Sequence, residues 1–158
     1  MRGGVAVWQR ATLRGDALEA LSVIVATGAN AKWLGLPQEE RLARTGGGVS
    51  ACAVCDGALP AYRNAVVAVV GGGDSAAEES TYLTKFAKEV LLIHRRDELR
   101  ASKVMADRVL TNPKITPLWN TRVIEVLGDD FITGLRLEDT VTGAQREVEV
   151  GGLFIAIG

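Results

Sequence analysis

Five apolar residues in a row, Val66–Val70, lead directly into the glycine run Gly71–Gly73. An unbroken apolar run of this length predicts a strand buried on both faces, which is typical of a parallel sheet. The residues from Ser75 to Lys85 predict a helix that packs back onto that strand. Glu89–Ile93 predicts the next buried strand, and a second helix is expected over residues 101–110. Strands that alternate with helices in this way predict an α/β fold.

The rest of the chain predicts two different kinds of structure. Alternating polarity and intervening turns predict an antiparallel meander from strands at about 115–119, 122–127, 131–138 and 145–150, before a last buried strand at 153–157. Near the N-terminus, strands are expected at Val5–Trp8 and Leu21–Ala26, with a loop at 14–16. Residues 30–50 have no clear period and predict a connector. We therefore expect one segment at 1–45 and a separate domain at 46–158.

Charge and cysteine content narrow the function. The net charge is −1, which does not favour nucleic acid or an anionic membrane surface as a partner. No apolar run approaches the roughly 20 residues that a transmembrane helix needs. Both cysteines lie in one C-x-x-C motif, which favours a reducing compartment and a redox or metal role. A cytoplasmic location is expected, with a plastid or mitochondrion as the alternative.

The glycine run has the spacing of a dinucleotide-binding turn. Gly71-x-Gly73-x-x-Ala76 places a glycine at the tight turn, a second where a pyrophosphate approaches the backbone, and a small residue where helix meets strand. Free N–H groups at the helix start would then face the phosphates. A plain structural turn is the alternative, but the preceding strand and following helix favour the dinucleotide. The predicted contacts are Gly71, Gly72, Gly73, Asp74, Ser75 and Ala76.

A basic cluster at the end of the next strand indicates which dinucleotide is bound. His94, Arg95 and Arg96 follow that strand, His94 lies 23 residues after Gly71 (94 − 71), and Arg100 lies one helical turn further on. A carboxylate at this place would bind the ribose hydroxyl of NAD, whereas guanidinium groups bind a 2′-phosphate. A solvated basic cluster is the alternative, although positive charge is unfavourable at a helix start. We predict NADPH, with these four residues as contacts.

The C-x-x-C motif, Cys52 to Cys55, ends sixteen residues before Gly71 (71 − 55) and has three interpretations. A zinc site would need two more ligands, and His94 is the only histidine, so no metal is expected. Two inert buried thiols fit poorly with the polar flanking residues. The remaining interpretation is a redox pair, in which one sulfur attacks and the other resolves the mixed disulfide. Asp56, next to the pair, is either a proton relay or a capping residue.

Three longer stretches resemble one family, the low-molecular-weight NADPH-dependent thioredoxin reductases. They are Ser50–Gly57 (SACAVCDG), Gly71–Glu79 (GGGDSAAEE) and Ile93–Lys103 (IHRRDELRASK). Three shorter stretches agree in type and order: Ala26–Ala29, Asn112–Ile115 and Gly152–Gly158. The resemblance covers essentially the whole chain. Valine inside the C-x-x-C resembles the plant and algal branch.

This resemblance implies a Rossmann-like NADPH-binding domain that carries the dithiol and is flanked by part of an FAD domain. NADPH would reduce FAD, FAD would reduce the Cys52–Cys55 disulfide, and the dithiol would reduce thioredoxin, usually in a homodimer. Cys55 would be the flavin-proximal sulfur, Cys52 the one that attacks thioredoxin, and Asp56 the proton donor.

No G-x-G-x-x-G for the FAD pyrophosphate occurs before residue 30, so FAD is expected to be bound largely by segments outside this chain. Two rival functions remain. One is a flavin disulfide reductase of the peroxiredoxin-reductase type. The other is an NADP-binding module without a catalytic cycle.

Overall fold

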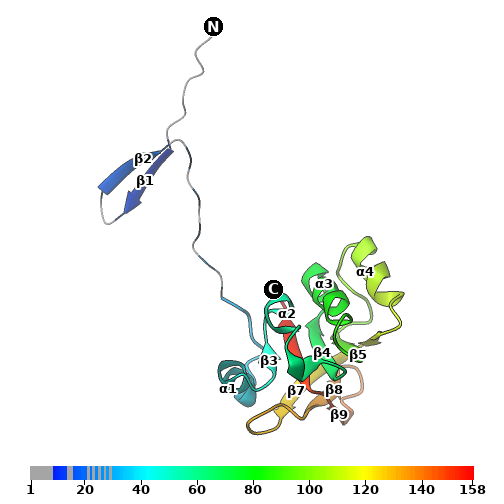
Figure 1. Ribbon diagram of the computed structural model, residues 1–158. Helices are drawn as coiled ribbons and strands as arrows, with labels where there is room; N and C mark the ends of the chain where they lie inside the picture. The colour runs from blue at the N-terminus through cyan, green and yellow to red at the C-terminus, as the bar shows by residue number, and fades with distance from the viewer. Residues whose placement is uncertain are drawn as a thin grey trace. The chain divides into compact units, whose positions relative to one another are not determined.

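The computed structural model describes residues 9–13, 16–20, 22, 24, 26, 28 and 30–158, which divide into two compact units, Met1–Asn30 and Ala31–Gly158. In the first unit, β1 (Gln9–Leu13) and β2 (Asp16–Ala20) form an antiparallel hairpin (Figure 1). The predicted strand Val5–Trp8 lies outside the described residues. The predicted strand at 21–26 is wrong for Ser22, Ile24 and Ala26, because the hairpin pairs the residues next to its short connection instead.

The second unit is built on a five-stranded parallel sheet in the order β3-β10-β4-β5-β6. Its central strand is the apolar run, in which Val67, Ala68 and Val69 are fully buried. The sheet therefore confirms a strand covered on both faces. Its strands are β3 (Val49–Ser50), β4 (Val66–Gly71), β5 (Glu89–Ile93), β6 (Ile115–Leu118) and β10 (Gly152–Ala156).

The strand β6 corrects one prediction. It was expected to begin the antiparallel meander, but Ile115 pairs with Val90 and Leu118 with Ile93 in parallel register with β5. The helix between β5 and β6 carries the chain back across the sheet, and such a crossover makes the second strand parallel to the first.

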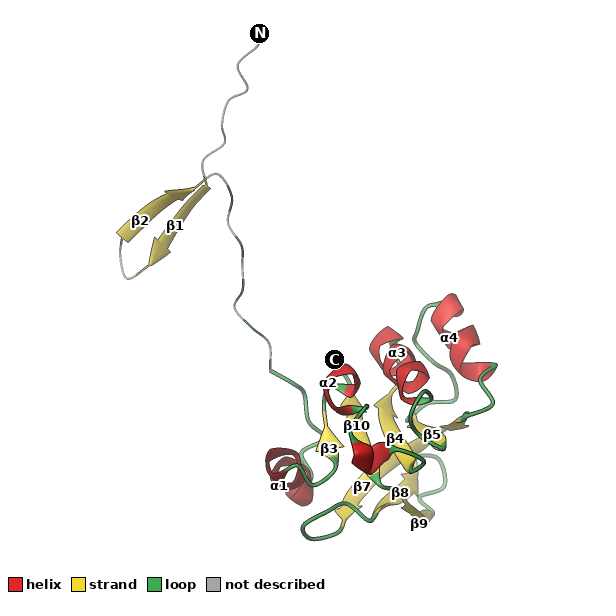
Figure 2. Cartoon of the chain, in the orientation of Figure 1, coloured by secondary structure: helices red, strands yellow, loops and turns green. Residues whose placement is uncertain are grey.

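Helices cover one face of this sheet (Figure 2). They are α2 (Ala53–Asp56), α3 (Asp74–Leu83) and α4 (Lys103–Leu110), with a short 3-10 turn at Pro60–Tyr62. The helix predicted at 75–85 is confirmed within two residues, and it buries Ala76, Ala77 and Leu83 against the sheet. None of the helices in the described part of the chain is long and apolar enough to cross a membrane.

The antiparallel meander and α1 (Pro37–Thr45) cover the other face. The meander consists of β7 (Thr121–Leu127), β8 (Gly134–Asp139) and β9 (Gln145–Glu149), as predicted apart from the strand ends. On this face of the sheet, Leu135 and Leu137 of β8 belong to one hydrophobic core with Leu153 of β10 and Leu42 of α1. The α/β fold class, with a parallel sheet and an antiparallel meander, is confirmed.

The helix α1 lies in the stretch that was expected to be a connector. Its sequence is mostly polar, and its only buried residues are Glu39 and Leu42, so a single apolar side chain marks the face that packs inward. It ends at Gly46, which has φ of 73° and closes the helix in the left-handed conformation. The helix α1 packs on β3 and β7, within the compact unit that begins at Ala31.

Candidate redox and dinucleotide site

The glycine turn joins β4 to α3, and its three glycines have different surroundings. A Cβ on Gly71 would lie 2.4 Å from the carbonyl oxygen of Ala156 and 2.6 Å from the Cβ of Ala76. A Cβ on Gly72 would lie 2.1 Å from Cε1 of His94. A Cβ on Gly73 would meet nothing within 4 Å. The fold itself therefore requires the first two glycines, whereas the third borders open space.

That space is a cavity of about 1080 Å³ at the carboxyl ends of β4, β5 and β10. In open α/β sheets, ligands bind beyond the carboxyl ends of the strands, where the strand order reverses. The strand β4 occupies such a position, since β10 lies on one side of it and β5 on the other. The predicted cofactor residues that line the cavity are Gly71, Gly72, Gly73, Ser75, His94, Arg95, Arg96 and Arg100.

Two predicted contacts, Asp74 and Ala76, do not line this cavity. Ala76 is fully buried where α3 packs on the sheet. Oδ1 of Asp74 accepts a hydrogen bond of 2.7 Å from the backbone N–H of Ser102. Both residues therefore hold the walls of the cavity in place.

The loop that carries the basic cluster is fixed by its backbone. The N–H of Arg100 donates to the carbonyl of Gly72 at 2.7 Å, and the N–H of Asn120 donates to the carbonyl of Arg96 at 3.0 Å. The side chains of Arg95, Arg96 and Arg100 are exposed, and no ion pair among the described residues involves them. A fixed backbone thus presents three guanidinium groups to the cavity, and no carboxylate in the described part of the chain forms an ion pair with them.

His94 has a different environment from these arginines. It is 7% exposed, its ring contacts the position where a Gly72 side chain would lie, and no described residue donates to or accepts from Nε2. Burial lowers the pKa of His94 below 6.5; backbone groups of Gly71 and Glu98 oppose this change, and the charges of Arg96 and Arg95 add to it. The imidazole is therefore neutral at pH 7 and forms part of the wall of the cavity.

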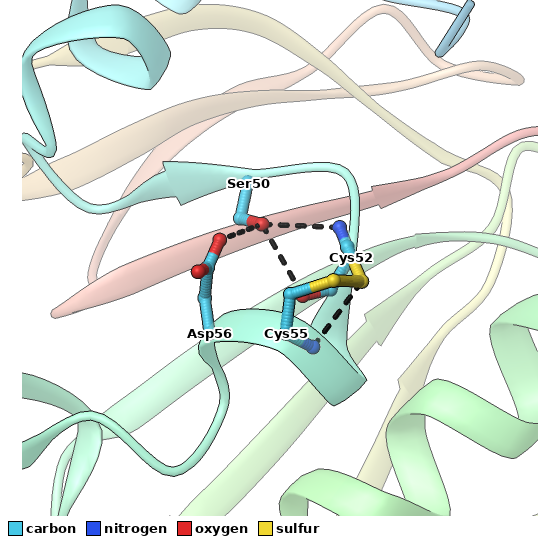
Figure 3. The surroundings of a disulfide bond; sticks show 4 residues. All are labelled: Ser50, Cys52, Cys55 and Asp56. Carbon is cyan, nitrogen blue, oxygen red and sulfur yellow. Dashed lines mark hydrogen bonds between the residues drawn. A yellow bond between two sulfur atoms is a disulfide. The ribbon is translucent and has the colours of Figure 1, made fainter. Parts of the chain in front are cut away.

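The two cysteines of the C-x-x-C motif are joined in a disulfide, with their Cα atoms 5.3 Å apart. Cys52 is the residue before α2, and Sγ of Cys52 accepts a hydrogen bond of 3.2 Å from the N–H of Cys55 (Figure 3). Cys55 is exposed and Cys52 is half-buried. The pair thus lies at a helix start where a thiolate is stabilised, and where another molecule can reach it.

Ser50 links the cysteines to Asp56. Its hydroxyl donates to Oδ2 of Asp56 at 2.6 Å and accepts from the N–H of Cys52 at 3.0 Å, so Figure 3 shows the Asp56 carboxylate turned toward Ser50. The negative charge of Asp56 also contributes, after burial, to the raised pKa of Tyr62. Sequence reasoning did not assign a role to Ser50. The only available signal was a serine two residues before the motif, where a side chain can bond to nearby backbone.

The disulfide and the cavity lie at the same edge of the sheet. Cys52 follows the carboxyl end of β3, and β3 runs parallel to β10, whose end borders the cavity. The cysteines themselves do not line the cavity. The two sites are therefore adjacent in topology but separate in space.

A parallel sheet with a glycine turn, a basic cavity at its carboxyl edge and an accessible disulfide define a dinucleotide-binding domain with a redox-active cysteine pair. The sequence carries the same signature, because residues 3–158 match the profile of the pyridine nucleotide-disulphide oxidoreductases. The chain belongs to this family.

Among proteins of known name, the chain is similar to thioredoxin reductases. It is 55% identical to the thioredoxin reductase of Mycolicibacterium smegmatis over 140 residues, which is 89% of this chain and 44% of the relative. It is 50% identical to thioredoxin reductase 1, mitochondrial, of Arabidopsis thaliana over 149 residues, 90% of this chain and 39% of that protein. These similar identities do not separate a plant branch from a bacterial one. The chain spans less than half the length of either relative.

Solved structures of thioredoxin reductases are also similar to this chain. The thioredoxin reductase of Lactococcus lactis in its FR conformation superimposes with a TM-score of 0.81 at 41% identity, covering 96% of this chain and 49% of that one. A ferredoxin-flavin thioredoxin reductase from Clostridium acetobutylicum has a TM-score of 0.59 at 27% identity, covering 94% of this chain and 45% of that one. The fold is thus found also in a reductase whose name refers to ferredoxin.

Proposed function

We propose that this chain is the NADPH-binding, dithiol-carrying part of a thioredoxin reductase, with NADPH and FAD as cofactors and thioredoxin as substrate. The main support is an accessible disulfide at the same sheet edge as a cavity lined by three guanidinium groups that form no ion pair with any described residue. The similarity to thioredoxin reductases supports thioredoxin rather than a peroxiredoxin-type partner as the substrate. A homodimer and a cytoplasmic location are proposed from the family resemblance alone.

The choice of NADPH is supported by the cavity rather than by the fold, since a similar fold occurs in a reductase named for ferredoxin. Open space beside Gly73 would allow a pyrophosphate to approach the backbone, and Arg95, Arg96 and Arg100 would bind the 2′-phosphate. Bound NADPH would supply two electrons as hydride, which a flavin commonly passes on to a disulfide. FAD is proposed from the family, and no described residue is assigned to it.

The chemistry assigned to this chain is thiol–disulfide exchange. The Cys52 thiolate attacks one sulfur of the thioredoxin disulfide, which breaks that bond and forms a mixed disulfide. Cys55 then attacks the Cys52 sulfur, which re-forms the Cys52–Cys55 bond and releases reduced thioredoxin. The Ser50 hydroxyl connects the Asp56 carboxylate to the backbone N–H of Cys52. We assign Asp56 as the donor of the proton that the leaving thiolate takes up.

Trapping the mixed disulfide tests this proposal. A Cys55→Ser chain cannot resolve the intermediate, so incubation with a thioredoxin activated as a mixed aromatic disulfide should give a covalent 1:1 adduct through Cys52, detectable by intact mass. Cys52→Ser is the matched control and should give far less adduct. An oxidised peroxiredoxin partner, offered in competition, should not displace thioredoxin. An equal yield from both variants, or preferential capture of the peroxiredoxin partner, would contradict the proposed substrate.

A further inference from the structure

Part of the wall of the large cavity comes from the antiparallel meander. These lining residues lie on β7 or in the turn after β8, and none of them belongs to a motif that predicted a coenzyme contact. They are Thr121, Arg122, Val123, Ile124 and Thr140. Arg122 is the only charged residue among them, so the meander brings a further guanidinium group to the cavity that Arg95, Arg96 and Arg100 also line.

The start of β7 is fastened to the loop that carries the basic cluster. The N–H of Thr121 donates to the carbonyl of His94 at 2.9 Å, and the N–H of Asn120 donates to the carbonyl of Arg96 at 3.0 Å. Arg122 is the next residue along β7. These two bonds therefore place Arg122 at the end of the cavity where the basic cluster lies, rather than at the glycine turn.

The guanidinium group of Arg122 is held by Glu138, its partner across the β7–β8 pair. Nε of Arg122 donates to Oε1 of Glu138 at 2.8 Å, and Nη2 lies 2.5 Å from the same oxygen. The Glu138 side chain is 18% exposed and that of Arg122 is 60% exposed. Because a guanidinium group has N–H donors on all three nitrogens, this contact leaves those of Nη1 for another acceptor. The ion pair thus fixes the group on the wall and leaves one edge open.

We propose that Arg122 is a specificity-determining residue that binds the 2′-phosphate of NADPH together with the arginines of the basic loop. The proposal rests on the proposed function for the identity of the coenzyme. A phosphate monoester has three acceptor oxygens and more than one negative charge near pH 7, so it can bind several guanidinium groups at once. Glu138 offsets the charge of Arg122 but leaves its open N–H groups directed by the ion pair. Selectivity for NADPH then depends on residues from both sheets of the domain.

The decisive variant is Arg122→Gln, which shortens the side chain and removes its charge at an exposed position. Titration calorimetry of the 158-residue chain would give the affinities for NADPH and NADH. We expect NADPH to bind about three- to tenfold more weakly, because a charge-assisted hydrogen bond is lost, and NADH to change less than about twofold.

The matched control is Arg136→Gln on β8. Arg136 also forms ion pairs within the meander, with Glu125 and Glu147, but it does not line the cavity. Its replacement disturbs the same sheet and changes the net charge equally, and it should leave the ratio of the two affinities unchanged. Urea unfolding of both variants would show that each still folds cooperatively.

Several results would overturn the role of Arg122: an unchanged preference for NADPH, equal losses for NADPH and NADH, or the same loss of preference in Arg136→Gln. Loss of cooperative unfolding in Arg122→Gln would also overturn it, because the residue would then be structural. A failure of the proposed coenzyme looks different, since the unaltered chain would itself bind NADPH no better than NADH. Failure to trap thioredoxin would concern the substrate alone and leave the coenzyme affinities as expected.

Discussion

The three consecutive glycines of the turn between β4 and α3 have different physical roles. Gly71 and Gly72 are confined by backbone and by the His94 ring, so a side chain there has no room in the folded chain. Gly73 has room, but it lines the cavity in which a dinucleotide is proposed to lie. The first two glycines are thus explained by packing, and only the third calls for a ligand.

Alanine substitutions separate these roles. Gly71→Ala should lower the free energy of unfolding by about 1–3 kcal/mol, because its Cβ would overlap the Ala156 carbonyl. Gly73→Ala should leave stability nearly unchanged but weaken NADPH binding by about tenfold or more, because the methyl group occupies the pyrophosphate approach. Urea unfolding and titration calorimetry on the same two variants give both numbers. A Gly73→Ala chain that binds NADPH normally would remove the pyrophosphate from this turn.

The exposed arginines provide the second test at this scale. Replacing Arg95 and Arg96 together with glutamate should weaken NADPH by at least about 10-fold, since each charge-assisted hydrogen bond contributes about 1.5–3 kcal/mol. NADH lacks the 2′-phosphate and should lose much less affinity. Arg108→Glu, at an exposed position of α4 outside the cavity, changes the net charge half as much and should change the affinity for either coenzyme very little. Equal losses for NADPH and NADH would contradict the phosphate role.

At the scale of elements, α1 depends on one buried carboxylate. Glu39 is 1% exposed and accepts hydrogen bonds from the N–H groups of Leu34, Gly35 and Leu36 at 2.7, 2.8 and 3.2 Å. It thereby satisfies three backbone donors at the point where the chain enters the helix. This contact fixes the segment before α1, part of which lines the cavity through Leu34 and Leu36.

Two adjacent glutamates allow this role to be measured. Glu39→Ala should cost about 2–3 kcal/mol in the free energy of unfolding, because partly buried N–H groups lose a charged acceptor. Glu40→Ala, one residue later, removes only an exposed ion pair with Arg44 and should cost less than about 0.5 kcal/mol. Urea titrations of the two variants would provide the comparison. Similar costs at both positions would mean that the three N–H bonds contribute little.

For the whole molecule, the sheet is stable because both of its faces are covered by different kinds of structure. Helices bury Val67 and Val69 on one side, and the meander with α1 buries Ala68 and Val70 on the other. The carboxyl edge of the sheet stays free for chemistry. His94 lies at this edge with its ring buried, so its protonation affects the stability of the whole unit.

The sign of this pH dependence follows from the lowered pKa of His94. The unfolded chain takes up a proton near pH 6.5 while the folded chain does not, so stability present above pH 6.5 should fall as the pH drops below it. Since His94 is the only histidine, His94→Gln should remove this loss. The raised pKa of Glu79 acts in the opposite sense, with stability lost as pH rises above 4.5, and should persist in that variant. Unfolding midpoints at intervals from pH 4 to 8 would measure both slopes.

The sequence alone determined the features that arise within a few neighbouring residues. The apolar run before Gly71 predicted a doubly buried strand, the spacing to Ala76 predicted the strand–turn–helix unit, and the C-x-x-C spacing predicted a redox pair. Such patterns are readable because backbone geometry and burial set their period locally. Strand ends and helix ends differed by one to three residues, as fraying at element ends makes usual.

Only the tertiary structure decided which distant residues meet. It placed β6 in the parallel sheet, and it folded the charged helix α1 over the core that the meander shares with the sheet. Even the short-range link from Ser50 to Asp56 depends on where β3 ends and α2 begins. These contacts join elements that crossovers bring together, and hydrophobic periodicity carries no information about which polar groups will face each other there.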